Sequence, residues 1–237
     1  MKKSVIFLAG MVITMIAAGQ NQRTVEEITN TPPEFSAFQT IVQGKYFETI
    51  DNYLINTVEY PQEALNWGMQ GTEVIKFVVT PSGEVTNFSV INSVCPEMDA
   101  EVIRVLQTTS GLWKPGSING KTVAMEQEVN VAFKLHSSRD FLSMAKDYLK
   151  QGNKLLMKGS TKKALGYYDK AVTLLPNEVA LLAVRGMCRL QQGDADGAAA
   201  DLKRLKLLGY FDNQHAEDLY TDSSLEDLKV LVENIHL

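Results

Sequence analysis

Apolar and polar positions repeat with two different periods along this chain. From Phe47 to Val58 the apolar residues recur every three or four positions, which predicts an amphipathic helix. Residues 72–80 and 85–91 instead alternate with a period of two, around the turn sequence Pro81-Ser82-Gly83. Two alternating segments around such a turn predict a β-hairpin.

One more helix and one more strand follow the hairpin. Pro96-Glu97-Met98-Asp99 places acids in the first turn of a helix, where they suit the helix dipole. Residues 122–135 alternate again, and Gln127 is the one polar residue on their apolar face. We therefore predict an α+β domain over residues 44–136, with a small three-stranded antiparallel sheet, helices on one face and the last strand at an edge.

The second half of the chain is predicted to be all helical. Residues 140–206 carry no strand signal, and their pattern repeats after about 34 residues, the period of the tetratricopeptide repeat. Gly152 and Ala164 recur in this way as Gly186 and Ala198. The sequence predicts two such repeats, that is four helices, over residues 140–213, and a capping helix over residues 214–237.

The N-terminus has the layout of a secretory signal peptide. Lys2 and Lys3 precede a 14-residue apolar run that ends at Ala18. A spanning helix needs about 20 residues, so cleavage of residues 1–19 is the favoured prediction and an uncleaved inner-membrane anchor the alternative. Residues 20–43, with Thr31-Pro32-Pro33, are predicted to be a linker.

Composition and residue placement predict neither a nucleic-acid-binding protein nor an enzyme. The formal net charge is −5, without the clustered Lys/Arg surface that phosphate binding needs. The three histidines are scattered, and no metal-ligand spacing, nucleophile–base pair or phosphate loop is present, so we expect no cofactor. Cys95 and Cys188 are predicted to be buried free thiols, and Trp67 and Trp113 to be packing residues.

The first domain resembles a known family. From about Ile50 to Leu135 the chain is similar to the TonB C-terminal domain family. The ordered motifs that carry the resemblance are Tyr60-Pro61, Gly68-Met69-Gln70-Gly71, Phe77-Val78-Val79-Thr80-Pro81-Ser82-Gly83-Glu84-Val85, Pro96-Glu97-Met98-Asp99, Trp113-Lys114-Pro115-Gly116, Asn119-Gly120-Lys121 and Val129-Asn130-Val131-Ala132-Phe133.

The resemblance implies a function in the periplasm of Gram-negative bacteria. Proteins of this family bind an extended peptide of an outer-membrane transporter by adding it to the sheet as a strand. It further implies that the contacts lie along the last strand and just before Tyr60. The peptide-binding residues implied here are Asn56, Thr57, Val58, Glu59, Tyr60, Met125, Gln127 and Val129.

Several functions are compatible with these patterns. A full TonB protein has a spanning helix and a long proline-rich spacer, whereas this chain has a short apolar run and seven prolines. The favoured interpretation is a periplasmic adaptor that binds an envelope protein, such as an outer-membrane TonB-dependent transporter, and a second protein on its repeats. The alternatives are an anchored energy transducer and an envelope-assembly scaffold without a transport role. The last strand could also pair with a second copy to form a homodimer.

Overall fold

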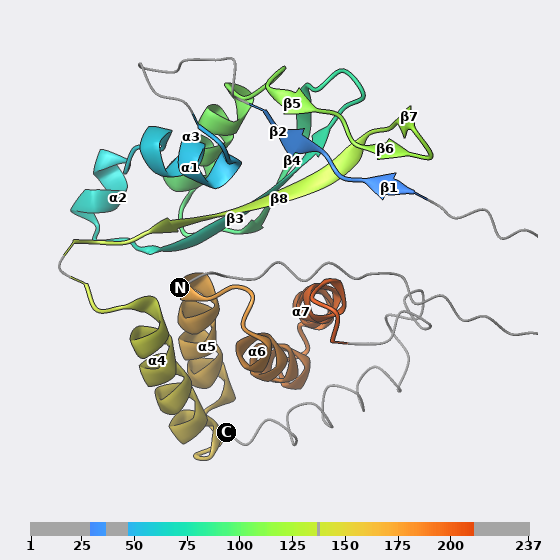
Figure 1. Ribbon diagram of the computed structural model, residues 1–237. Coiled ribbons are helices and arrows are strands. Elements are labelled where there is room, and N and C mark those ends of the chain that lie inside the picture. Colours follow the sequence, from blue (N-terminus) through green and yellow to red (C-terminus); the bar gives the residue numbers. More distant parts are fainter. Residues whose placement is uncertain (1–28, 37–46, 137, 211–237) are drawn as a thin grey trace, which may run out of the picture.

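The computed structural model describes residues 29–36, 47–136 and 138–210, which form a mixed α+β unit and a helical unit (Figure 1). The main elements of the α+β unit are α1 (Ile50–Thr57), α2 (Gln62–Asn66), β3 (Gly71–Val79), β4 (Val85–Asn92), α3 (Pro96–Gln107) and β8 (Met125–Phe133). The helical unit contains α4 (Phe141–Leu156), α5 (Thr161–Leu174), α6 (Val179–Gln191) and α7 (Ala195–Leu207). The predicted signal peptide and capping helix lie outside the described residues.

The main sheet is antiparallel with strand order β4-β3-β8. The register between β3 and β8 runs without interruption from Gly71 opposite Phe133 to Val79 opposite Met125. This confirms the predicted three-stranded sheet and the edge position of its last strand. β8 is shorter than predicted at its start, because the amide of Val123 donates to the carbonyl of Gly116 and β7 (Lys121–Thr122) pairs with β6 (Ser117–Ile118) instead.

One face of the sheet packs on α1 and α3, as predicted. The inward side chains of β3, Ile75, Phe77 and Val79, are fully buried against apolar residues of α3. Trp113 joins this core edge-on to Phe77, with ring centroids 5.4 Å apart. The predicted packing role of Trp67 is wrong: this side chain is 82% exposed, because the five-residue α2 buries only Ala64.

Part of the predicted linker belongs to the α+β unit. β1 (Asn30–Thr31) pairs with β6, and β2 (Glu34–Phe35) pairs with β5 (Trp113–Lys114). The buried Phe35 ring lies 5.4 Å from Trp113 and 5.7 Å from Tyr53. The strand pairings and the burial of this aromatic side chain together hold the segment, and the prolines of residues 32–33 hid that signal in the sequence.

The opposite face of the sheet contacts the helical unit, which lies below the sheet in Figure 1. Val74 faces away from the first core and is nevertheless fully buried. The Thr72 hydroxyl donates to the carbonyl of Leu174 at 2.8 Å, and Asn92 Nδ2 donates to the carbonyl of Thr72 at 2.7 Å. A Cβ at Gly71 would lie 2.8 Å from the carbonyl oxygen of Thr173, so glycine permits this close contact.

Small residues and buried charges organise the helical unit. Tyr168 is fully buried against Gly152, and its hydroxyl donates to Asn153 Oδ1 at 2.8 Å. Asp201 is also buried and accepts from Arg185 at 2.6 Å and from Arg189 at 2.9 Å. A buried carboxylate needs such partners to remain charged. Cys95 and Cys188 are buried and unpaired, as predicted.

Within residues 29–36, 47–136 and 138–210, no helix combines the length and the apolar character that crossing a membrane requires.

Glu73 is a buried carboxyl group at the end of β3. Its side chain is fully buried, and its Oε1 accepts from the amide of Val94 at 2.8 Å. Burial, with the neighbouring Asp99 carboxyl, raises the pKa of Glu73 to about 8. The folded chain therefore holds a proton on Glu73 at pH values where the unfolded chain has released it.

We predict that Gly152→Ala destabilises the protein although alanine is the better helix former. A Cβ at residue 152 would lie 2.8 Å from Tyr168 Cδ1 and closer still to Cε1. We expect the free energy of unfolding to fall by about 1–3 kcal/mol, the usual cost of overpacking. The matched control is Gly166→Ala in α5, where a Cβ meets no atom within 4 Å and should add up to about 1 kcal/mol. Urea titration of the two variants checks this, and equal shifts would contradict it.

We also predict that stability falls as pH rises. Because the folded-state pKa of Glu73 is raised, its stabilising effect is complete below about pH 4.5 and is lost as pH approaches 8. Between these pH values unfolding releases a proton. The free energy of unfolding therefore falls by up to about 1.4 kcal/mol per pH unit. Glu73→Gln should flatten this dependence in urea titrations at several pH values, and the exposed Glu84→Gln should not. An unchanged slope in Glu73→Gln would disprove the assignment.

Candidate functional site

β8 forms an open edge of the main sheet. Its nine residues pair with β3 on one side, and among the described residues no strand pairs with the other side. Its side chains alternate between more buried and exposed positions along the whole strand. An edge strand offers a row of backbone N–H and C=O groups that another strand can pair with.

A groove of about 800 Å³ runs along this edge. α1 and the segment after it form one wall, and the second half of β8 forms the other. The lining residues are Asp51, Leu54, Ile55, Val58, Tyr60, Glu128, Val129, Asn130, Val131, Ala132, Phe133 and Lys134. Ile55 is 78% exposed, so a large apolar side chain on the helix wall faces solvent beside the open strand.

The helix wall is fixed by the local sequence. The Thr49 hydroxyl accepts from the amide of Asn52 at 3.2 Å, which caps the start of α1. The helix ends at Val58, whose backbone is extended, and Pro61 begins the next helix at its N-cap. Three extended residues, 58–60, therefore connect the two helices beside the groove.

Three contacts hold this extended segment in place. The Tyr60 hydroxyl donates to the carbonyl of Met69, and its ring lies edge-on to Phe133 of β8, with centroids 5.3 Å apart. The amide of Glu59 donates to Glu101 Oε1 at 2.9 Å. Hydrogen bonds from Arg104 lower the pKa of Glu101, whereas burial raises the pKa of Tyr60. Both groups thus keep the protonation state that these contacts require.

β8 is also held from its far face. Arg204 of α7 donates to both carboxylate oxygens of Glu128 at 2.6 Å and to Asn177 at 3.0 Å. Asn177 in turn donates to Asn130 Oδ1 at 3.3 Å. Bidentate Arg–carboxylate pairs fix orientation as well as distance. The helical unit therefore fixes the position of β8 while leaving its edge accessible.

The structure brings together part of the predicted peptide-binding set. Val58, Tyr60 and Val129 line the groove. Met125 and Gln127 lie on the same side of β8 as Val129 but before the lined stretch.

The other three predicted residues lie beside the groove rather than in its lining. Asn56 and Thr57 form the last turn of α1, and Asn56 Nδ2 donates to the carbonyl of Asn52 at 2.7 Å. Glu59 belongs to the extended segment, where its amide holds Glu101.

Sequence reasoning missed several groove residues. Val131 and Phe133 had the required signal, because they continue the alternation of Val129 along the strand. Leu54 had a weaker sequence signal, since it belongs to the apolar face of α1. The exposed Ile55 carried none, because it lies off that face.

The side chains that line the groove are mainly apolar. Of its charged residues, Asp51 and Lys134 are exposed, whereas Glu128 is paired with Arg204 on the far face. In the described part of the chain no group of His, Cys, Asp and Glu could hold a metal ion. The arrangement suits an extended chain that pairs with β8 and places apolar side chains under α1.

Comparison with known proteins connects this site to one family. Residues 56–135 match the family model of the Gram-negative bacterial TonB protein C-terminal. The match includes residues 58–60 and the whole of β8, but it starts after most of α1. This segment, about a third of the chain, is therefore similar to the TonB C-terminal domain.

A solved structure and a search of curated proteins complete the comparison. The chain is similar to the solution NMR structure of the TonB C-terminal domain of Helicobacter pylori, with 19% sequence identity, 38% of this chain and 92% of that chain covered, and a TM-score of 0.29. No curated protein matches the chain.

Proposed function

We propose that this chain is an envelope protein-binding module that takes up an extended peptide of another protein on the open edge of β8. The groove between α1 and that edge carries the proposal, because it combines a free strand with an apolar wall. The match of residues 56–135 to the TonB C-terminal family supports the same reading. The partner that we propose for this edge is an extended segment of an outer-membrane transporter or of another envelope protein.

Strand addition fits the groove better than a compact ligand does. The lined stretch extends over seven consecutive residues, 128–134, of which the first six belong to β8, and it is about 20 Å long at the usual rise per residue. Backbone hydrogen bonds along the edge would supply affinity. The apolar pockets around Ile55, Val131 and Phe133 would select every second side chain of the peptide.

The helical unit is the second binding surface in this proposal. Its four helices follow the spacing of two tetratricopeptide repeats, which commonly hold protein partners. Contacts through Thr72, Asn92 and Arg204 fix it to the far face of the sheet. A partner on the repeats and a peptide on β8 would thus be held at a defined mutual orientation.

The site of action proposed is the periplasm, after cleavage of residues 1–19. Without an anchor the chain would act as an adaptor rather than as a transducer pulled by a membrane motor. Binding, and not catalysis, is the proposed activity.

We predict that a photo-crosslinking amino acid at Ala132 captures one extended segment of an envelope protein in living Gram-negative cells. Ala132 is exposed and lines the groove. The matched control is Ser89 on β4, an exposed position on the opposite edge strand. Mass spectrometry of the crosslinked peptides should map a contiguous partner segment for position 132 only. Equal capture at position 89 would contradict the proposal.

A substitution in the helix wall of the groove gives a second test of the crosslink at position 132. Ile55→Glu places a charge against the apolar floor and should lower the crosslink yield at position 132 by about tenfold, because an unpaired charge is costly beside apolar groups. Leu142→Glu on α4, at a side chain that is 51% exposed, should leave the yield unchanged. Crosslinks to a second copy alone would indicate a homodimer, and partners unrelated to transporters would indicate an assembly scaffold.

A further inference from the structure

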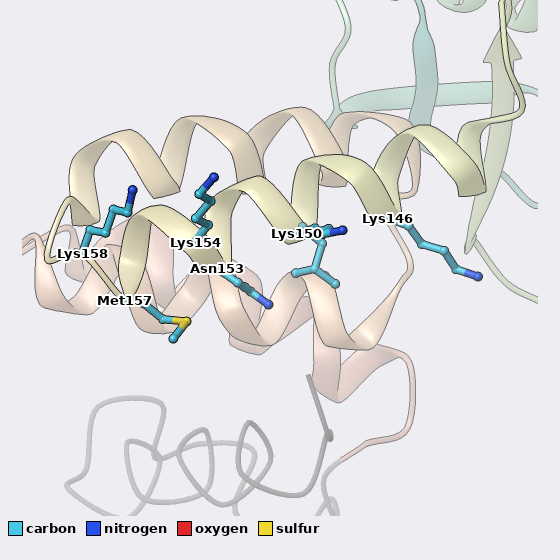
Figure 2. A pocket seen from close by; sticks show the side chains of 7 residues that line it. Lys146, Lys150, Asn153, Lys154, Met157 and Lys158 are labelled. Atoms are coloured by element: carbon cyan, nitrogen blue, oxygen red, sulfur yellow. The ribbon is translucent and has the colours of Figure 1, made fainter.

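A row of four lysines runs along the outer face of α4 and into the turn that follows it. They follow one another at intervals of four residues, which places the first three on one side of α4, and Figure 2 shows all four along this helix and the turn at its end. All four are exposed, and none forms an ion pair within the part of the chain that the structure describes. They are Lys146, Lys150, Lys154 and Lys158.

An apolar hollow accompanies these lysines. Its volume is about 740 Å³, and all its described lining residues belong to α4 and the turn that follows it. Met157 is 89% exposed there, and Leu149 lies one turn from Lys146. The one acid on the exposed side of α4, Asp147, is paired with Arg139 at 2.7 Å. A cationic ridge beside an apolar strip is the complement of an acidic amphipathic helix.

The chain itself contains such a segment after its last described residue. Between residues 217 and 233 the sequence has six acids and a single lysine, Lys229. Ser223-Ser224-Leu225-Glu226 has the spacing of a helix capping box. Val230 falls outside the helical face that four apolar residues of this segment share, at intervals of three, four and three residues: Leu225, Leu228, Val232 and Ile235.

We propose that residues 223–235 dock as an acidic amphipathic helix along the lysine face of α4. Leu225, Leu228 and Val232 would cover Leu149 and Met157, while Glu226 and Glu233 would lie against the lysines. The occupant is thus a segment of the same chain. It competes with any acidic partner helix for this face of the repeats, which makes it an internal inhibitor of that surface.

The connection is long enough for this docking. Residues 211–222 can span roughly 40 Å when extended, whereas α4 with its 16 residues is about 24 Å long. Tethering also gives the segment a local concentration that reaches about millimolar for a flexible connection. A free partner helix of equal affinity would rarely reach such a concentration.

Zero-length carbodiimide crosslinking of the full chain tests the proposal, since this reagent joins a lysine amine and a carboxylate that are in contact. An equimolar mixture of heavy-isotope-labelled and unlabelled chain distinguishes crosslinks within one chain from crosslinks between two copies. We expect crosslinks from Lys150 or Lys154 to Glu226, Asp227 or Glu233, each within one isotope type. Mixed-isotope crosslinks would overturn the proposal in favour of a second copy, and the absence of these crosslinks would overturn it outright.

Charge reversal makes the test specific. Lys150→Glu with Lys154→Glu should reduce the crosslinks at least about tenfold, and adding Glu226→Lys with Asp227→Lys should restore them with the charges exchanged. The matched control, Lys162→Glu with Lys163→Glu, changes two exposed lysines of α5 and should have no effect. In 1 M salt, where the Debye length is about 3 Å, the crosslink yield should fall. Equal loss in the control pair would contradict a specific site.

The crosslinking test of the lysine face is independent of the peptide binding proposed for β8. The lysine face and the β8 groove share no lining residue, so failure of either experiment leaves the other intact.

Discussion

The rest of the structure depends on the burial of β3 from both faces. This central strand pairs with β4 on one side and β8 on the other, and α3 covers one of its faces. The helical unit covers the first part of its opposite face, where Val74 has no exposed surface. A three-stranded sheet is small for a stable unit, and a second covered face adds apolar burial that it would otherwise lack.

This constraint also explains why β8 is both fixed and accessible. Pairing with β3 fixes its inner side, Tyr60 contacts Phe133 from the side of α1, and Arg204 of α7 holds Glu128 from the side of the helical unit. What remains open is the outer edge. A strand that is already held in its bound geometry loses little conformational freedom when a peptide pairs with it, and this preorganisation favours affinity.

Sequence patterns predicted most of the fold because the two periods are regular. The alternation of β3 and β8 and the stripe of α3 directly reflect one-sided burial. The prediction stopped where burial depends on distant contacts. Phe35 is buried by a pairing with Trp113, 78 residues away, and Glu73 is buried by the segment before α3. No local pattern encodes either contact.

The candidate site was predictable to a similar extent. The resemblance of residues 50–135 to the TonB C-terminal domains led to Val58, Tyr60 and Val129, which do line one groove. Ile55 could not be found this way, because its exposure makes it look like an ordinary surface residue until β8 is placed opposite. The docking of the helical unit on the sheet was not predictable either, since it rests on a few polar contacts and on Gly71.

Amide hydrogen exchange along β8, measured on the full chain with and without solubilised outer membranes, tests the central claim most directly. Strand addition predicts that alternate amides between Met125 and Phe133 gain protection when membranes are present, while the amides of β4 do not change. Unchanged exchange in β8 would contradict the claim. Protection that instead rises with protein concentration alone would mean that the edge pairs with a second copy.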